Sequence, residues 1–299
     1  LKAGDHVVCS RSVFGSTIML FGREFAKFGV ETTFVSQTDV AEWQRAIKPN
    51  TRLLFAESPT NPLTEVCDIA ALSAVAKQAG AWLAVDNCFC SPALQRPIEY
   101  GADLVIHSGT KYLDGQGRVI AGAICGPEQL INEKFVPVMR SAGMCLSPFN
   151  AWVVLKGLET LSIRMEAQSA RALKLAAWLE TQPQVERVFY PGLPSHPQHD
   201  LARRQLHGGF GGMVTFELAR AERAEAARVL NRLHLFTQAV SLGDVDSLAC
   251  HPASTTHSFV SQQAREAAGV GEGMIRLSVG IEHPDDLVAD LGQALQTGG

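Results

Sequence analysis

The first half of the chain alternates short apolar runs with stretches of helical spacing. Five runs rich in apolar and β-branched residues predict strands, and they lie at residues 6–10, 30–36, 53–58, 82–87 and 102–109. Between them, residues 16–29 and 68–80 predict helices that each end at a glycine, with Asp68 as the expected N-cap of the second. Near-continuous apolar strands separated by helices predict a mostly parallel sheet covered on both faces.

The second half has a different pattern. Residues 148–182 form one long helical run in which leucines recur at helical spacing. Strands are predicted at residues 185–192, 211–218 and 274–280, with helices over 221–233 and from Pro284 onward. We expect an α/β fold with a large domain over residues 1–157 and a smaller α/β C-terminal domain over residues 158–299, with the boundary within the long helical run.

Composition narrows the classes of partner. The 299 residues are 46% hydrophobic and 19% charged, which is typical of a globular chain with a sizeable core. A formal net charge of −4 argues against general nucleic-acid binding, and no apolar stretch reaches the length of a membrane span. The start, LKAGDHVVCS, lacks the apolar region of a signal peptide. We therefore expect a cytoplasmic protein that acts on a small molecule.

The cysteines and histidines favour neither disulfides nor a metal site. Seven cysteines are scattered along the chain without any C-x-x-C pair, which favours reduced thiols. The nine histidines are dispersed as well, and no H-E-x-x-H motif occurs. The sequence therefore predicts no bound metal.

Polar residues follow three of the predicted strands. Asn61 comes shortly after one strand, Asp86 lies at the end of the next, and Ser108, Thr110 and Lys111 follow a third. Because ligands bind beyond the carboxyl ends of strands in an open parallel sheet, we expect these residues to converge. Taken alone, Asp86 could be a turn or N-cap aspartate and Lys111 a surface lysine. Together, a lysine, a carboxylate and hydroxyls suit pyridoxal phosphate, which forms a Schiff base with lysine.

Two further residues allow both a structural and a functional interpretation. Arg276, in a strand of alternating pattern, is either an edge or surface arginine or a bidentate clamp for a substrate carboxylate. Phe14, in SVFGST, is either a core residue or an aromatic ring that stacks on a flat ligand. Neighbouring residues alone do not decide between these interpretations.

An ordered set of motifs makes the prediction specific. SVFGST, ESPTNP, VDNCFC, HSGTKYLDGQGR, SLGDVDSL, HPASTTH and IRLSVGIE occur in this order. Together they resemble the Cys/Met-metabolism family of pyridoxal-phosphate enzymes, the cystathionine γ-synthase group of fold type I, over essentially the whole chain. The stretches KYLDGQGR, DNCFCSPALQ, LSPFNAWVVLKGLETL and GLPSHPQHDLARRQ resemble in particular the O-succinylhomoserine sulfhydrylases of this group.

The resemblance implies a cofactor site in the large domain. Lys111 would hold pyridoxal phosphate covalently and move protons during the reaction. Asp86 would pair with the pyridinium nitrogen, and Ser108 and Thr110 would hold the phosphate. The family architecture is a large, mostly parallel domain and a small C-terminal domain. The resemblance also implies a homodimer or homotetramer with active sites between subunits.

Four more residues receive roles from the same resemblance. Phe14 would stack on the cofactor ring, where many relatives have tyrosine, and Asn61 would lie near the ring oxygen. Arg276 would bind the substrate α-carboxylate, and Ser241 would help to position the lysine or the substrate. The implied reaction is γ-replacement on an O-acylhomoserine, foremost O-succinylhomoserine, with sulfide, giving homocysteine in methionine biosynthesis.

The sequence also departs from the family pattern. SLGDVDSLACHPASTTHS is nearer to methionine γ-lyase and cystathionine γ-synthase, so these activities remain alternatives, although Ser16 stands where the lyase has a reactive cysteine. Gly109 replaces an alanine found in many relatives and is expected to loosen its loop. Relatives carry further chain before the position of Leu1, including groups that hold the phosphate. We therefore expect an N-terminally truncated large domain, and an inactive fragment with a structural role is a further alternative.

Overall fold

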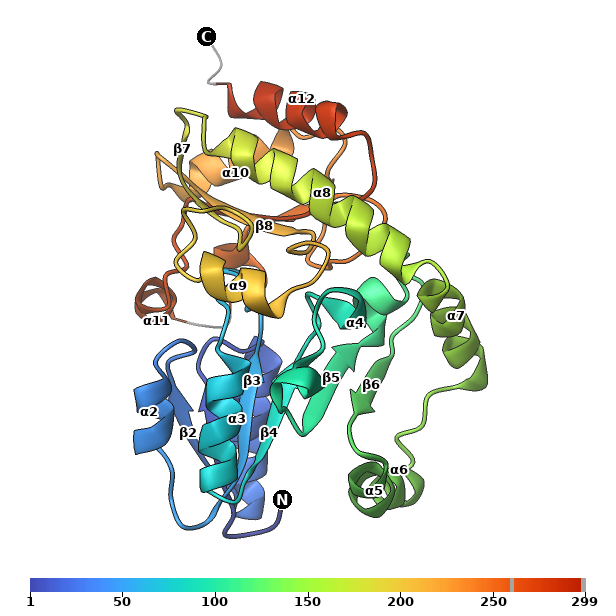
Figure 1. Ribbon diagram of the computed structural model, residues 1–299. Helices are drawn as coiled ribbons and strands as arrows, with labels where there is room; N and C mark the ends of the chain where they lie inside the picture. Colours follow the sequence, from blue (N-terminus) through green and yellow to red (C-terminus); the bar gives the residue numbers. More distant parts are fainter. Residues whose placement is uncertain (259–260, 297–299) are drawn as a thin grey trace. The chain divides into compact units, whose positions relative to one another are not determined.

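The computed structural model describes residues 1–258 and 261–296, and the chain forms two compact units (Figure 1). The first consists of Leu1–Asn61, Glu65–Asp114 and Arg118–Glu159, and the second of Pro62–Thr64, Gly115–Gly117 and Thr160–Gly299. Each unit is built around its own sheet. Within the described residues, no helix combines the length and apolar character that crossing a membrane requires.

The first unit contains a six-stranded sheet in the order β2-β1-β3-β4-β5-β6. Its strands are β1 (His6–Ser10), β2 (Glu31–Val35), β3 (Thr51–Glu57), β4 (Trp82–Asp86), β5 (Leu104–Ser108) and β6 (Gly122–Cys125). β1 to β5 pair in parallel and β6 runs antiparallel to β5, so the predicted strands and their mostly parallel pairing are confirmed. β6 was not predicted, because its four residues, GAIC, are too few to show the alternation typical of a strand.

Helices cover both faces of this sheet. α2 (Val40–Arg45) and α3 (Ile69–Gln78) pack on one face around Trp43 and Leu54, as Figure 1 shows. The predicted cap of α3 is confirmed, because the Asp68 carboxylate accepts a hydrogen bond from the Ala71 N–H at 2.9 Å. The other face is covered by residues 15–28, where Phe21 packs edge-on against Phe55 of β3.

Two predicted helices are broken into shorter pieces. Residues 15–28 form α1 (Gly15–Met19), a π-helical turn η1 (Leu20–Glu24) and a 3₁₀ turn η2 (Phe25–Phe28) rather than one helix. The predicted run over residues 148–182 is two helices, α7 (Pro148–Leu158) and α8 (Leu161–Leu179). Thr160 breaks it with a non-helical backbone (φ −115°, ψ 6°), and its hydroxyl accepts a hydrogen bond from the Arg164 guanidinium at 3.1 Å. Leucine spacing alone could not locate this break.

The remaining elements of the first unit are short. They are α4 (Ser91–Leu94), η3 (Pro97–Tyr100), η4 (Gly109–Leu113), α5 (Glu128–Leu130), η5 (Ile131–Phe135) and α6 (Val136–Ala142). Of these, η4 carries Lys111, and it begins directly at the end of β5.

The second unit has a five-stranded sheet in the order β7-β8-β11-β10-β9. Its strands are β7 (Val185–Phe189), β8 (Met213–Leu218), β9 (Thr237–Gln238), β10 (Leu248–Cys250) and β11 (Met274–Ser278). The helical elements are α8, α9 (His199–Gln205), α10 (Arg223–Asn231), η6 (Pro252–Ser254), α11 (Gln262–Ala267) and α12 (Pro284–Leu295). α8, α10 and α12 share one hydrophobic core with the sheet (Figure 1). The predicted strands and last helix are confirmed, whereas β9 and β10 were too short to predict.

Candidate active site

The ends of three neighbouring parallel strands meet at one edge of the first sheet. Glu57 at the end of β3 pairs in register with Asp86 at the end of β4, and Asp86 pairs with Ile106 of β5. The polypeptide then leaves the sheet toward Asn61 after β3 and toward Lys111 after β5. The predicted convergence of these three segments is confirmed.

Two carboxyl groups lie side by side at this edge. Burial raises the pKa of Glu57 well above its ordinary value, and the neighbouring charge of Asp86 raises it further. Burial also raises the pKa of Asp86, to about 6, although its Oδ1 accepts a hydrogen bond from the Cys88 N–H at 3.0 Å. Burial and the neighbouring charge therefore favour the neutral form of Glu57, and a nearby cation would stabilise the charged form of Asp86.

Glu57 also ties two predicted site segments together. Its Oε2 accepts a hydrogen bond from the Phe14 N–H at 2.7 Å, and its carboxyl accepts another from the Asn61 backbone. The Phe14 ring is 48% exposed, so it is not a core phenylalanine. The sequence placed Glu57 at a strand end but gave it no role. The sequence pattern that could have identified Glu57 is LLFAE, in which a carboxyl group directly follows an apolar strand segment.

The loop after β5 has an unusual backbone at Lys111. η4 is a π-helical turn, and Lys111 departs from helical geometry within it (φ −98°, ψ −129°). The positive charge of Lys111 lowers the pKa of the Cys88 thiol, while burial, Asp86 and Glu57 raise it more strongly. Lys111, Asp86 and Glu57 therefore all act on the same thiol, which places them in one electrostatic neighbourhood.

The same loop is fastened to the residues before β6. The Thr110 hydroxyl accepts a hydrogen bond from the Ala121 N–H at 3.1 Å and donates one to the Ala121 carbonyl at 3.3 Å. The Gly109 N–H donates to that carbonyl at 2.7 Å. A Cβ on Gly109 would lie 2.6 Å from the Ala121 Cβ. The expectation that Gly109 loosens the loop is therefore wrong, because the missing side chain allows Ala121 to pack against it.

Helix α7 holds the loop from its other end. A Cβ on Gly157 would lie 2.2 Å from the Leu113 carbonyl oxygen and 2.5 Å from that of Asp114, so the helix approaches the loop backbone directly. The buried Asp114 carboxylate accepts hydrogen bonds from the Arg118 N–H at 2.7 Å and from its Nε at 2.9 Å. These contacts fix the backbone that follows Lys111.

Two predicted site residues belong to the second unit. Arg276 lies in β11, between β8 and β10, and is only 2% exposed. The alternative of an edge or surface arginine is therefore wrong. Its Nη2 donates hydrogen bonds to the carbonyls of Val240 and Ser241, each at 2.9 Å. The structure thus brings Arg276 and Ser241 together, while the other six predicted residues belong to the first unit.

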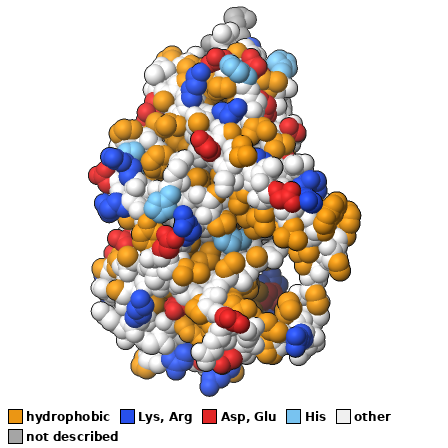
Figure 2. All heavy atoms as spheres, turned by 45° about the vertical axis from the view of Figure 1, so that its right-hand side comes forward, with side chains coloured by type: hydrophobic (Ala, Val, Ile, Leu, Met, Phe, Trp, Pro, Cys, Tyr) orange, Lys and Arg blue, Asp and Glu red, His pale blue; other side chains and the backbone are white. Residues whose placement is uncertain are grey.

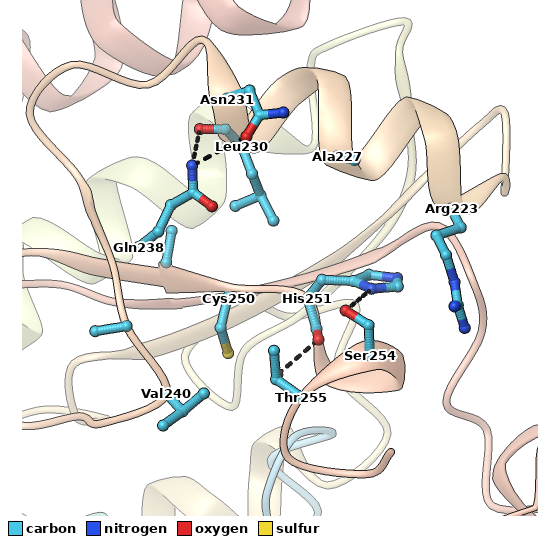
Figure 3. Close-up of a pocket in the computed structure, with 12 residues that line it drawn as sticks. Arg223, Ala227, Leu230, Asn231, Gln238, Val240, Cys250, His251, Ser254 and Thr255 are labelled. Carbon is cyan, nitrogen blue, oxygen red and sulfur yellow. Dashed lines mark hydrogen bonds between the residues drawn. The ribbon is translucent and has the colours of Figure 1, made fainter.

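The second unit also contains a cavity of about 360 Å³ beside α10 and β10 (Figure 3). Among the described residues that line it, Arg223 is the one cation, and it pairs with Glu272 at 2.8 Å. His251 lies 2.9 Å from the Glu272 carbonyl, so Nε2 donates there and Nδ1 accepts from the Ser254 hydroxyl at 2.7 Å. Burial raises the pKa of the Cys250 thiol. This lining therefore presents a neutral imidazole and a protonated thiol rather than an activated nucleophile.

Comparison with known proteins identifies the family. The model of the family described as Cys/Met metabolism PLP-dependent enzyme matches residues 1–296. The chain belongs to this family. The motif resemblance is therefore confirmed, and members of this family use pyridoxal phosphate, which implies fold type I for the mixed α/β chain.

Individual relatives carry several activities. The O-succinylhomoserine sulfhydrylase of Pseudomonas aeruginosa is 53% identical over 294 residues, covering 98% of this chain and 72% of that protein. The O-succinylhomoserine sulfhydrylase of Mycobacterium tuberculosis is 45% identical, covering 99% of this chain and 73% of that protein. The L-methionine γ-lyase of Pseudomonas putida is 44% identical, covering 99% and 74% respectively. The chain is thus similar to both sulfhydrylases and γ-lyases.

The chemistry of the strand-end residues fits the family cofactor. Burial disfavours the charge of Asp86, and a protonated ring nitrogen beside it would supply the missing cation. Lys111 supplies an amine from the adjacent loop, and Ser108 and Thr110 supply hydroxyl groups. The half-exposed Phe14 ring offers an apolar face. The donor set therefore matches the needs of the ring, aldehyde and phosphate of pyridoxal phosphate.

Proposed function

We propose that the chain catalyses γ-replacement on an O-acylhomoserine, foremost O-succinylhomoserine, with sulfide as the incoming group and homocysteine as the product. The observation that carries the reaction class is the partly buried Asp86, with its raised pKa, in the same electrostatic neighbourhood as the Lys111 loop. The similarity to O-succinylhomoserine sulfhydrylases supports the choice of substrate. The scattered thiols support a place in the reducing cytoplasm.

In this proposal the first unit holds and tunes the cofactor. When bound, pyridoxal phosphate withdraws electrons from the substrate carbon next to the amino group. Asp86 would hold a proton on the ring nitrogen by pairing with it, and Phe14 would lie on the ring face. Ser108 and Thr110 would donate hydrogen bonds to the phosphate, which requires the Thr110 hydroxyl to turn from the Ala121 carbonyl.

The remaining residues would act on the substrate. Lys111 Nζ would remove the proton from the α-carbon and return a proton later, acting as general base and then general acid. Arg276 would bind the α-carboxylate, because a guanidinium matches a carboxylate with two parallel hydrogen bonds. Ser241 would help to position the lysine or the substrate, and Asn61 would lie near the ring oxygen. We also propose assembly into a homodimer or homotetramer with active sites between subunits.

An absorbance spectrum tests the cofactor site. Purified protein with added pyridoxal phosphate should show a visible band that borohydride removes, and peptide mapping should place the reduced adduct on Lys111. Lys111→Ala should abolish the band, whereas Lys77→Ala, a change at the exposed end of α3, should leave it intact. A band that persists in Lys111→Ala would contradict the assignment.

Activity assays then separate the candidate reactions. Formation of homocysteine from O-succinylhomoserine and sulfide supports the proposal. Formation of cystathionine with cysteine would instead indicate a synthase. A second candidate, γ-elimination, is favoured by the 42% to 44% identity to cystathionine and methionine γ-lyases. It would release a 2-oxoacid and ammonia without any added thiol. A chain that binds no cofactor under any condition would support a purely structural role.

A further inference from the structure

Two amide side chains form a fully buried pair at the end of β4. Asn87 follows β4 directly, Gln95 follows α4, and both are 0% exposed. Figure 2 shows charged side chains of both signs on the surface of the molecule, whereas this pair lies inside the first unit. Gln95 Nε2 donates a hydrogen bond to Asn87 Oδ1 at 2.9 Å, and Asn87 Nδ2 donates one to the Gln95 carbonyl oxygen at 2.8 Å. These two residues are here called the amide pair.

The amide pair also connects the segments that follow β3 and β4. Gln95 Nε2 donates a second hydrogen bond to the Ser58 carbonyl oxygen at 2.8 Å, and Asn87 Nδ2 donates a second one to the Ser91 carbonyl oxygen at 3.1 Å. Each NH₂ group therefore uses both of its protons on oxygen acceptors. Rotating either amide by half a turn would place its own oxygen against those acceptors, so the partners fix the orientation of both side chains.

The backbone around Asp86 depends on these contacts. The Ser58 N–H donates to the Asp86 carbonyl oxygen at 3.1 Å, and the Asn87 N–H donates to a carbonyl oxygen of β5 at 2.9 Å. The Cys88 N–H donates to Asp86 Oδ1 at 3.0 Å. The orientation of the Asp86 carboxyl group is therefore set by the backbone of the next two residues, and Gln95 holds that backbone through the Asn87 side chain.

We propose that Gln95 is a positioning residue, which holds the Asp86 carboxylate through the amide pair in the orientation that pairs with the protonated ring nitrogen of the cofactor. This inference rests on the proposed function of Asp86 and deepens it by naming the residue that supports that group. A site residue must be held within about 0.5 Å of its working geometry, and hydrogen bonds from the surrounding residues provide that precision. Gln95 acts through Asp86 rather than on the ring.

A simpler role for the amide pair is to stabilise the turn between β4 and α4. Ser91 in this turn has a φ of 56°, which is unfavourable for a residue with a side chain, and Asn87 holds its carbonyl oxygen. A residue that only stabilises the turn changes the free energy of unfolding and nothing else. A positioning residue also changes the properties of Asp86, so the experiments measure those properties.

The pH dependence of stability reports the surroundings of Asp86 without any cofactor. Burial is the largest cause of the raised pKa of Asp86, about 6, and Glu57, Lys111 and Cys88 are titratable groups in its neighbourhood. Asp86→Asn removes this titration, so the variant should gain stability over the parent as the pH rises from about 4 through 6. In a Gln95→Met background Asp86 can move toward water and titrate nearer its ordinary pKa, so this gain should fall by at least half.

Absorbance with bound pyridoxal phosphate provides a second readout. In Gln95→Met, the half-saturating concentration of pyridoxal phosphate should rise about tenfold. The midpoint of the visible band's pH titration should rise by about half a pH unit or more, because a ring nitrogen that loses its proton no longer lowers the pKa of the imine nitrogen. In the activity assay, kcat should fall by a larger factor than KM rises.

Ser73→Ala is the matched control. Ser73 is buried in α3, and its hydroxyl donates a hydrogen bond to the Gly101 carbonyl oxygen at 2.8 Å, before the amino end of β5. Its loss should lower the free energy of unfolding without changing either readout of Asp86. Gln95→Glu covers the risk that Gln95→Met misfolds, because a neutral carboxyl group keeps one donor for the two acceptors. It should give smaller shifts in the same directions.

Two results would overturn the inference. One is a Gln95→Met variant that loses stability as Ser73→Ala does, yet keeps both the band midpoint and the pH dependence due to Asp86, since the amide pair would then only stabilise the turn. The other is a variant that changes none of these measurements. The stability test needs neither cofactor nor substrate, so it can succeed where the proposed reaction fails. A parent chain that binds no pyridoxal phosphate would refute the proposed function alone.

Discussion

Gly109→Ala should destabilise the chain by adding one methyl group beside the Lys111 loop. The new Cβ would lie 2.6 Å from the Ala121 Cβ, 3.1 Å from its carbonyl carbon and 3.2 Å from its carbonyl oxygen. Non-bonded carbon atoms prefer separations of about 3.5–4.0 Å, so the loop or the segment before β6 must move by roughly 1 Å. Overpacking of this kind costs about 1–3 kcal/mol. Four hydrogen bonds between Gly109, Thr110 and Ala121 resist the movement.

The new Cβ would clash mainly with one atom, the Ala121 Cβ, so a second substitution at Ala121 should relieve the clash. Ala121→Gly removes the Cβ at 2.6 Å and leaves the milder contacts with the Ala121 backbone. The double variant should therefore recover more than half of the stability that Gly109→Ala loses. The coupling between the two sites should be about 1 kcal/mol or more, as found for residues in direct contact.

Urea unfolding of the parent, both single variants and the double variant measures the coupling. Gly122→Ala is the matched control, because a Cβ on Gly122 would meet only the His107 carbonyl oxygen, at an ordinary 3.7 Å. It should change the free energy of unfolding by less than about 0.5 kcal/mol. If Gly109→Ala were as stable as Gly122→Ala, or if Ala121→Gly gave no rescue, the steric reasoning would be refuted.

Three other changes test separate parts of the structure by urea unfolding. Asp86→Asn removes a carboxyl whose pKa burial raises to about 6. Without cofactor, the neutral form of Asp86 contributes stability that is complete below about pH 4 and is lost as the pH rises through 6. The free energy of unfolding of the variant should therefore increase relative to that of the parent by up to about 3 kcal/mol as the pH rises from 4 to above 6. No such gain would contradict the burial of this charge. Gly157→Ala places a Cβ 2.2 Å from the Leu113 carbonyl oxygen and should cost about 1–3 kcal/mol. If Gly157→Ala left the free energy of unfolding unchanged, α7 would be able to move away from the Lys111 loop without cost. Asp290→Ala removes the carboxylate that accepts the N–H groups of His234 and Leu235, and should cost about 3 kcal/mol. Asp286→Ala, at an exposed position in the same helix, is its control.

The fold elements that were predictable have strong local causes. The β3 strand contains the apolar run LLFA, and α3 has a cap, a periodic face and a terminal glycine, so each is specified within its own segment. β6, β9 and β10 have no such specification, because two to four residues carry no measurable period. They form by pairing with a neighbouring strand: β6 with β5, β10 with β11 and β9 with β10. Pairing of this kind depends on tertiary structure and is invisible in a local pattern.

In the candidate site, too, some features follow from local sequence and others depend on tertiary contacts. Convergence of Asn61, Asp86 and Lys111 was predictable, because parallel strands place their carboxyl ends at one edge of a sheet. The roles of individual residues come from the family resemblance, and they remain predictions. The contacts that hold the site segments in place were not predictable. They are the hydrogen bonds by which Glu57 links Phe14 to Asn61, and the packing of Ala121 on Gly109. Each depends on a contact between residues distant in sequence.

These supports indicate how the chain holds a charged site in place. Burial disfavours the charged form of Glu57, and its carboxyl group accepts hydrogen bonds from the backbones of Phe14 and Asn61. Burial also disfavours the charge of Asp86, which a cation beside it would stabilise. On the opposite side, Gly109 and Gly157 bring Ala121 and α7 against the Lys111 loop from two directions. A lysine side chain with four rotatable bonds can reach several positions from a firmly held backbone without moving its loop. A base that removes a proton at one atom and returns one at another requires this combination of fixed backbone and mobile side chain.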